Sequence, residues 1–493
     1  MDAAVAACAV QGVVEPQSTG IGGDCFVLYA PSDGNGGSGD IIAYNGSGRA
    51  PGAATPEWFA DQGVNEIDLH SPHAVTVPGA IDAWCRLLDD HGTRSIGDAL
   101  QYAIHYAREG YPVHDRIASD WKRCEQMLTK DPTAKRIYLT DGGAPKTGSL
   151  QRQTDLAATL EVIAAEGRDG FYKGAVAEDI VGHLKSLGGA HELEDFANAA
   201  GEYVDPIKTS YRDHEVYECP PNGQGVAALL LLNILAEMGL EKLEPLSPER
   251  LHLTIEAGRL AYRERNALVS DPGQVEVPVD QLLSAEHAAQ LRGQIDPAKA
   301  TVNPASTGLP GGDTVYLCVV DKDRNAVSFI NSLFHSFGSG LVAPKSGVIL
   351  QNRGASFNLD PTHSNCIQPG KRPMHTIIPG MLVQDGRAVM PFGVMGGQYQ
   401  AFGHAYFLNN LFEYGLDLQE SMDLPRLFPN VGGPVDIESG MPADVVKALQ
   451  DMGHSIGAPA KPIGGSQAIS IDWDEGVLTG ASEPRKDGCA IGY

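Results

Sequence analysis

The chain has 493 residues and a formal net charge of -26, with 42% hydrophobic and 20% charged residues. This length allows a large core, and the composition is typical of a globular α/β enzyme rather than a disordered chain. Because phosphate binding needs a basic surface, the excess of carboxylates argues against nucleic acid as a partner. The most apolar run, residues 226–235, is too short to cross a bilayer, so it predicts a buried helix and no membrane partner.

The first part of the chain combines predicted helices with glycine-rich turns. Residues 15–24 form such a turn before a strand at 25–29, but they lack the lysine and the spacing of a phosphate-binding loop. His70 and His73 have no third ligand at a fitting spacing, so we interpret them as loop histidines and predict no metal and no cofactor. Helices are predicted at residues 1–14, 95–115, 154–187, 226–235, 259–266, 401–415 and 442–452.

A polar, proline-rich stretch at residues 297–313 predicts an exposed loop that ends in two glycines and an aspartate. Thr314 then opens an alternating β-branched run, which is followed by a turn and a returning strand at 326–331. Taken alone, this pattern is an ordinary hairpin. The sharper hypothesis is that the chain cuts itself before Thr314, because a threonine with a free α-amino group carries nucleophile and base in one residue. We expect its strand to lie at the centre of a sheet.

A series of short motifs runs through the whole chain. They are Met1-Asp-Ala-Ala-Val-Ala, Gly20-Ile-Gly-Gly-Asp, Pro78-Gly79, Phe171-Tyr-Lys-Gly, Pro220-Pro221, Lys371-Arg-Pro, Gly396-Gly397, Gly465-Ser-Gln and Gly480-Ala-Ser-Glu-Pro-Arg-Lys. Together with the Val-Val-Asp-Lys-Asp hairpin that follows Thr314, they resemble the gamma-glutamyltranspeptidase family nearly from end to end. So many motifs in one order are hard to obtain by chance.

The resemblance implies a set of catalytic residues. Thr314 is the nucleophile, and its freed amine is the general base. Ser332 on the returning strand matches the family's second hydroxyl, which hydrogen-bonds the nucleophile. Gly396 and Gly397 match the glycine pair whose backbone N–H groups form the oxyanion hole, and such donors stabilise charge that exists only in the transition state.

The substrate-reading positions depart from the transpeptidase pattern. The family's asparagine after the second hydroxyl is Phe334 here, and its ammonium-binding glutamine and aspartate fall on Arg353 and Ser356. The two serines that follow Lys-Arg-Pro-x are His375 and Thr376. Arginine repels an ammonium group but binds a carboxylate through two hydrogen bonds. The Asn352-Arg-Gly-x-x-Phe and Met374-His-Thr-Ile-Ile-Pro pattern resembles the branch of the family that includes oxamate amidohydrolase.

One further substrate-binding candidate is displaced from its family position. In the transpeptidases an Arg-Glu-x-Ala-Pro motif supplies the arginine that binds the substrate α-carboxylate. Aligned on Ala50-Pro51, that place is taken by Ser47, and Arg49 stands two residues later. A two-residue shift along a strand keeps the side chain on the same face. Two interpretations of Arg49 therefore stay open: it binds the substrate, or it is a solvated surface residue.

The resemblance implies an α+β fold, a four-layer αββα sandwich of the N-terminal nucleophile hydrolase type. Residues 1–313 and 314–493 would be the large and small segments of one intertwined domain. The implied function is an amidohydrolase that cuts itself before Thr314 and hydrolyses a small carboxylate-bearing amide such as oxamate through a threonyl acyl-enzyme. A true gamma-glutamyltranspeptidase (glutathione hydrolase) and a non-catalytic binding relative stay open. The expected partners are a small amide substrate and the two fragments of one precursor, and a homo-oligomer is left open.

The cysteines and the start of the chain bear on the compartment. The eight cysteines are scattered and form no C-x-x-C pair, which favours a reducing compartment. The apolar N-terminus has no basic region, so it is a poor signal peptide and a cytoplasmic location is expected. Family members usually carry a further segment before this first helix, so a truncated N-terminus is the other interpretation.

Overall fold

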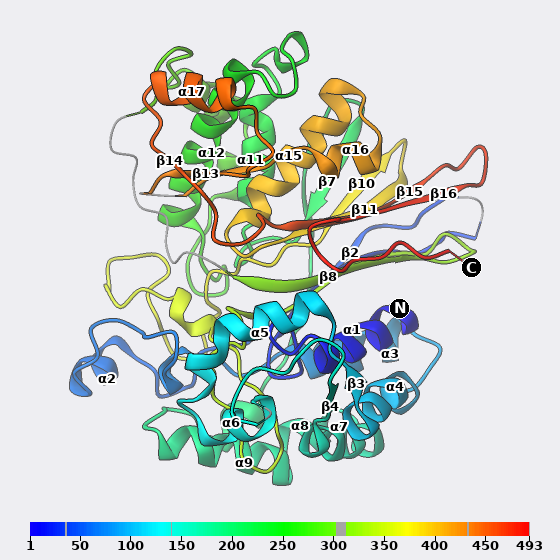
Figure 1. Cartoon of the computed structure of the whole chain (residues 1–493), viewed down its shortest axis with the longest axis vertical. Helices are drawn as coiled ribbons and strands as arrows, with labels where there is room; N and C mark the ends of the chain where they lie inside the picture. Colours follow the sequence, from blue (N-terminus) through cyan, green and yellow to red (C-terminus); the bar gives the residue numbers. More distant parts are fainter. Residues whose placement is uncertain (35–36, 140, 302–311, 431–432, 493) are drawn as a thin grey trace.

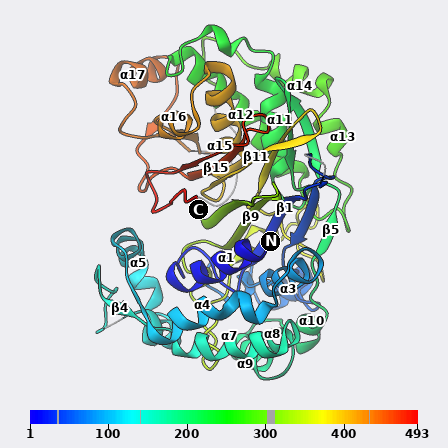
Figure 2. The same ribbon diagram turned by 90° about the vertical axis from the view of Figure 1, so that its right-hand side faces the viewer.

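The computed structural model describes residues 1–34, 37–139, 141–301, 312–430 and 433–492 (Figure 1). Most of the predicted loop at 297–313 lies outside the described residues. The fold is mixed α/β: two large sheets cross the middle of the molecule, and helices lie on the outer side of each (Figures 1 and 2). Among the described helices, none combines the length and apolar character that crossing a bilayer requires.

The first sheet carries Thr314 at one edge. Its five strands are, in spatial order, β5 (Glu202–Val204), β2 (Ile42–Gly46), β1 (Asp24–Ala30), β9 (Ala326–Phe334) and β8 (Asp313–Val320), with antiparallel neighbours throughout. The predicted hairpin is thus confirmed as β8 and β9. The expectation of a central strand for Thr314 is wrong, because β9 is the inner strand and β8 the edge strand. Local alternation predicts a strand but carries no information about its neighbours in the sheet.

A strand of the second sheet leads directly into the predicted glycine pair. Its six antiparallel strands are β16 (Leu478–Ser482), β15 (Gly465–Ile471), β11 (Arg387–Met395), β10 (Gly380–Gln384), β7 (His214–Glu218) and β6 (Ile207–Tyr211). There are two small sheets. One pairs β3 (Tyr111–Pro112) with β4 (Leu150–Gln151). The other has the order β12 (Leu427–Pro429), β13 (Val435–Ile437) and β14 (Ile456–Gly457). Because β11 stops one residue before Gly396, the second sheet positions the glycine pair while the first positions Thr314 and Ser332.

Two groups of helices pack on the outer faces of the sheets. Beside the first sheet lie α1 (Asp2–Val14), α3 (Ala80–His91), α4 (Ile96–Glu109), α5 (Asp115–Leu128), α6 (Pro132–Tyr138), α7 (Thr154–Glu166), α8 (Asp169–Tyr172) and α9 (Gly174–Ser186). Beside the second lie α11 (Gly225–Leu235), α12 (Pro248–Leu268), α14 (Ala285–Arg292), α15 (Tyr399–Tyr414), α16 (Leu418–Asp423) and α17 (Ala443–Asp451). Short helices α2 (Pro56–Asp61), α10 (Leu193–Ala197) and α13 (Val279–Leu282) complete the set among the described residues.

Helix α4 shows how local chemistry sets an element's limits. It begins at a capping box, in which the side chain of Ser95 accepts from the N–H of Asp98 and the Asp98 carboxylate accepts from the N–H of Ser95. It ends at Gly110, which adopts a φ of +98°, so the predicted extension to residue 115 is too long.

A separate apolar core fills the space between the two sheets. Phe26 and Ile330 of the first sheet pack there with Met381 and Ile471 of the second. The nine residues of β9 are all buried, because one face of the strand meets this core and the other meets the helices. The hydroxyl of Ser332 is therefore held in a rigid, water-poor place.

Three buried histidines are expected to make the fold sensitive to acid. Burial, more than any other cause, lowers the pKa of His191 and His454 from 6.5 to about 4 and that of His375 to about 3. Below pH 6.5 the unfolded chain therefore binds more protons than the folded chain. The free energy of unfolding should fall as the pH drops from 6.5 toward 4, by up to about 1.4 kcal/mol per pH unit for each ring.

Urea unfolding curves at several values between pH 7 and pH 4.5 measure this slope. His191→Gln, which keeps a donor toward the carbonyl of Val75, should make the slope shallower. The control His105→Gln, at an exposed position, should leave the slope of the unfolding free energy with pH unchanged. Equal slopes in the wild type and the His191 variant would contradict the neutral, buried state of that ring.

Candidate active site

Thr314 and Ser332 meet at the start of the hairpin. Their side chains are buried and their hydroxyl oxygens lie 3.1 Å apart. Ser332 donates to the backbone carbonyl oxygen of Asp313 at 2.9 Å and accepts from the N–H of Phe334 at 2.9 Å. Since the Ser332 proton is already used, the hydroxyl of Thr314 is the donor within the pair. The chain is continuous through the bond between Asp313 and Thr314, so the geometry is that of an uncut precursor.

A β-bulge lies opposite Thr314, the predicted nucleophile. Asp313 pairs with Phe334 and Val315 pairs with Asn331, so two residues of β9 stand opposite the single residue Thr314. Bulges of this kind re-aim side chains beside active sites. The strand ends at Phe334 with a φ of +80°, a backbone conformation that costs a bulky residue energy and so requires support from its surroundings.

Gln400 also contacts Thr314, the predicted nucleophile, although its position in the sequence had not singled it out. It is fully buried in the first turn of α15, and its Nε2 donates to Oγ1 of Thr314 at 3.4 Å. Its Oε1 accepts from the backbone N–H of Ile378 at 3.0 Å, which fixes the amide end that faces Thr314. The only signal in the sequence was a polar residue shortly after the glycine pair.

Gly396 and Gly397 form the turn from β11 into α15. Their φ angles are +128° and +59°, in the region that favours glycine. A Cβ on Gly396 would lie 2.9 Å from Cα of Gly464, and a Cβ on Gly312 would lie 2.6 Å from Cα of Gly397. The chain just before Thr314 thus packs directly on the glycine pair. The role of the pair as an oxyanion hole stays a prediction.

Arg353 is a fully buried cation beside these groups. Its Nη1 donates to Oγ1 of Thr376 at 2.8 Å, while its Nε and Nη2 have no hydrogen-bond partner among the described residues. The guanidinium lies over the ring of Phe334, 4.0 Å from the ring centre. Burial lowers the pKa of Arg353 to about 9, and the charge of Asp24 opposes this only in part. A buried guanidinium with two unused donors is suited to an anionic ligand.

His375 and Thr376 stand beside this arginine but have different partners. Nε2 of His375 lies 3.0 Å from Oδ2 of Asp24, and both residues are fully buried. Burial and the charge of Arg353 lower the pKa of His375 to about 3, so the ring is neutral near pH 7 and donates to the carboxylate. Thr376 orients Arg353 directly through a hydrogen bond. His375 acts on Arg353 only indirectly, because it holds Asp24, whose charge favours the charged guanidinium. Their contact with a substrate stays a prediction.

A pocket of about 390 Å³ opens next to Phe334. Ser356 and Gln398 also line it, and the hydroxyl of Ser356 is buried without a hydrogen-bond partner among the described residues. Phe334 touches both this pocket and the guanidinium of Arg353. The ring of Phe334 therefore stands between a ligand in the pocket and the guanidinium of Arg353.

Arg49 has its own partners. Its guanidinium lies 3.5 Å from Asp271 and 3.7 Å from Glu202, and it donates to the backbone carbonyl of Gly370 at 3.0 Å. The side chain is 37% exposed, and Arg49 is not among the described residues that line the pocket. These contacts favour the surface interpretation, and a contact of Arg49 with a substrate stays a prediction.

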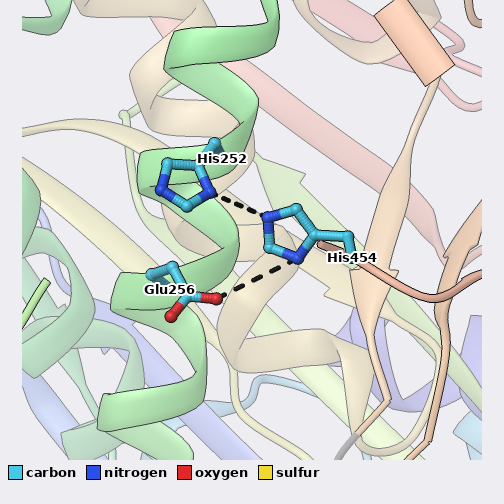
Figure 3. Close-up of side chains that lie close together, drawn as sticks. All are labelled: His252, Glu256 and His454. Carbon is cyan, nitrogen blue, oxygen red and sulfur yellow. Dashed lines mark hydrogen bonds and ion pairs between the residues drawn. The ribbon is translucent and has the colours of Figure 1, made fainter. Parts of the chain in front are cut away.

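Two histidines and a glutamate gather elsewhere, between α12 and the segment after α17 (Figure 3). His252, Glu256 and His454 offer ligand atoms that lie within 4.8 Å of one another. Nδ1 of His252 accepts from Nε2 of His454 at 2.8 Å, and Nε2 of His252 donates to the carbonyl of Asp296 at 2.8 Å. Arg259 donates to Glu256 at 2.7 Å. These contacts satisfy the side chains with one another, and the arginine disfavours a cation at the same place.

Comparison with known proteins places the chain in a family. The family model described as Gamma-glutamyltranspeptidase matches residues 1–493. The chain belongs to the gamma-glutamyltranspeptidase family. The prediction of an enzyme of this family is thereby confirmed.

Individual relatives within this family have different names. The chain is 35% identical to a protein named "Glutathione hydrolase-like YwrD proenzyme" from Bacillus subtilis (strain 168), over 100% of this chain and 93% of the relative. It is also 35% identical to "Oxamate amidohydrolase proenzyme" from Klebsiella pneumoniae, over 100% and 94%. The crystal structure of cephalosporin acylase from Bacillus halodurans superposes with a TM-score of 0.92 at 38% identity, covering 100% of this chain and 91% of that chain.

The structure therefore gathers most of the predicted site residues in one region. Thr314 and Ser332 are in direct contact, the glycine pair touches the preceding segment, and Arg353 contacts Thr376. Ser356 lines the adjacent pocket and His375 stands behind Arg353. Arg49 is the exception. Gln400, which the sequence alone had not marked, and Asp24, which ends the Gly20-Ile-Gly-Gly-Asp motif but had no predicted role in the site, belong to the same network.

Proposed function

We propose that the chain is a precursor that cuts itself before Thr314 and then hydrolyses a small carboxylate-bearing amide. The products of the cut are a large fragment, residues 1–313, and a small fragment, residues 314–493. The observation that carries this proposal is the contact of Ser332 with both the Thr314 hydroxyl and the Asp313 carbonyl oxygen. A four-layer αββα sandwich, formed by both fragments together, is the proposed description of the fold.

The cut begins with attack of Oγ1 of Thr314 on the carbonyl carbon of Asp313. Ser332 donates to the carbonyl oxygen, on which negative charge develops. The C–N bond then breaks, the nitrogen takes the proton of the hydroxyl, and an ester joins the two residues. Water hydrolyses this ester, which leaves a carboxylate on Asp313 and a free α-amino group on Thr314.

The second reaction uses the group that the first one frees. The α-amine of Thr314 takes the proton of its own hydroxyl, and the oxygen attacks the substrate amide. The backbone N–H groups of Gly396 and Gly397 stabilise the oxyanion, and Gln400 donates to the nucleophilic oxygen. The amine of the substrate leaves with a proton, and water releases the acyl group from Thr314.

The preferred substrate is an amide with a carboxylate close to the reacting carbonyl, as in oxamate. Arg353 supports this choice, because its unused Nε and Nη2 can bind a carboxylate in place of the ammonium that the transpeptidase pattern binds. The second candidate is true gamma-glutamyl transfer or glutathione hydrolysis, which is favoured by the name of one of the two equally similar relatives.

Oxamate and oxamide are the matched pair of substrates that tests this choice, because they differ only in the charged group. Purified, cut enzyme should prefer oxamate, and Arg353→Met should lower kcat/KM for oxamate by about 10- to 100-fold with little effect on oxamide. Arg250→Met is the control, since Arg250 is equally buried over an aromatic ring but lies against Tyr406.

Two results would speak against this function. Strong turnover of a gamma-glutamyl anilide with no turnover of oxamate would favour the second candidate. A single band on a denaturing gel that stays uncut on incubation, with no hydrolysis of either amide, would favour a non-catalytic binding relative.

A further inference from the structure

The side chain of Asp313, next to the predicted cut, is held in a ready-made carboxylate site. Nζ of Lys461 lies 3.1 Å from Oδ1 of Asp313, and the hydroxyl of Ser336 donates to Oδ2. Nζ of Lys461 also donates to the backbone carbonyl of Gly312 at 3.3 Å. Both ends of the carboxylate and the preceding peptide group are therefore bound by residues of the small fragment.

The charges around Asp313 are arranged for an anion. Burial by itself would raise its pKa, but the charges of Lys461 and Lys486 and the bond from Ser336 together lower it to about 2. Lys486 is half-buried, and desolvation lowers its pKa to about 8 although the charge of Asp313 opposes the shift. In a chain with a net charge of -26, one lysine in contact with this carboxylate and a second whose charge acts on it form a local exception.

The proposed cut changes the status of this site. Once the bond to Thr314 is broken, Asp313 is the last residue of the large fragment and is no longer covalently tied to the nucleophile. Gly312 also packs against Gly397, so a substrate can use the glycine pair only after this segment moves away. Lys461 and Ser336 then remain beside Thr314 without the carboxylate that they bound in the precursor.

We propose that Lys461 and Ser336 become a subsite for a carboxylate on the acyl part of the substrate. This inference rests on the proposed function and deepens it. In Asp313 the bound carboxylate is two carbon atoms away from the carbonyl carbon that Thr314 attacks. The subsite therefore suits amides of succinyl-like acids, whereas Arg353 is the proposed partner of a carboxylate joined directly to the carbonyl. In the precursor, the side chain of Asp313 therefore occupies this subsite before any substrate does.

A series of monoamides tests the spacing. Oxamate, malonamate, succinamate and glutaramate differ only in the number of carbon atoms between carbonyl and carboxylate. In cut enzyme, Lys461→Met should lower kcat/KM for succinamate about tenfold or more and leave oxamate within about twofold, and Ser336→Ala should act in the same direction. Lys447→Met is the control, because Lys447 pairs with Asp451 on the exposed face of α17.

The precursor's own sequence supplies a binding probe. Gly-Gly-Asp reproduces residues 311–313, and Gly-Gly-Asn replaces the side-chain carboxylate by a neutral group of the same shape. Calorimetric titration of cut wild-type enzyme should show binding of Gly-Gly-Asp about tenfold or more tighter than that of Gly-Gly-Asn. Lys461→Met should abolish the difference, while the weaker contact to the Gly312 carbonyl is lost equally for both peptides.

The two levels of the proposal fail in different ways. Because Lys461 also holds the precursor, the cut fraction of each variant is measured on a gel and all rates are given per cut chain. Cut wild-type enzyme that binds both peptides equally, or a Lys461 variant that loses all four monoamides alike, overturns the subsite alone. A wild-type chain that never cuts overturns the proposed function and the subsite with it.

Discussion

Replacement of Thr314 by alanine is expected to leave one uncut chain that hydrolyses no amide. In the proposed mechanism, the change removes the oxygen that attacks the Asp313 carbonyl in the first reaction and the substrate in the second. It leaves the carbonyl-binding hydroxyl of Ser332 in place, so the fold should be retained. We expect turnover to fall by about 10⁴-fold or more. Mass spectrometry of the purified chain after prolonged incubation, together with amide hydrolysis assays, measures both effects.

Thr314→Ser is the matched control for this experiment. It keeps a hydroxyl and, after the cut, an α-amine, but it loses the methyl group that restricts the side-chain rotamer. The serine variant should therefore still be cut and still be active, both more slowly than the wild type. An alanine variant that is cut at the usual position and hydrolyses amides at the usual rate would assign the nucleophile to another residue.

Replacement of Gly396 by alanine is expected to lower kcat for amide hydrolysis by about 10²- to 10³-fold. At a φ of +128° a side chain is strained, and its Cβ would lie 2.9 Å from Cα of Gly464. The turn must therefore shift, and the N–H groups of the glycine pair lose their alignment with the oxyanion. The cut before Thr314 should persist, because the carbonyl oxygen of Asp313 is bound by Ser332.

Rates of the cut and of substrate hydrolysis, measured on the same preparation, separate the two roles. Gly415→Ala is the control, since Gly415 also has a positive φ, +61°, but has open space around its Cα. That variant should lose about 1–2 kcal/mol of stability and keep its kcat. Parallel loss of the cut and of hydrolysis in a folded Gly396 variant would contradict separate oxyanion donors for the two reactions.

Local patterns predicted the elements well where the physical signal was also local. The helices at α1, α11, α15 and α17 and the hairpin of β8 and β9 follow from periodicity and turn residues. Residues 154–187 predict helices separated at 170–174. The structure has α7, α8 and α9 there, so the short helix α8 covers most of the predicted break, and Gly167 and Gly174, with positive φ, stand at the two divisions. The predicted helix at 259–266 is the later part of the longer α12.

Contacts between distant residues could not be predicted in the same way. Gln400 reaches Thr314 across 86 positions, and Lys461 reaches Asp313 from beyond β13 and β14. Neither residue stands out in its own segment, because glutamine and lysine are common on helices and in loops. The family resemblance supplied Ser332 and the glycine pair, but the motifs that carried it include neither of these two residues.

The amino-acid sequence by itself determined the family of the chain and the choice of Thr314 as the predicted nucleophile. The order of the motifs and the chemistry of a threonine can both be read without a structure. Only the tertiary structure decided that β8 is an edge strand, that Arg353 keeps unused donors, and that Lys461 and Ser336 hold the Asp313 carboxylate. The reason is physical: burial and charge pairing depend on which segments the two sheets bring together, and no short stretch of sequence carries that information.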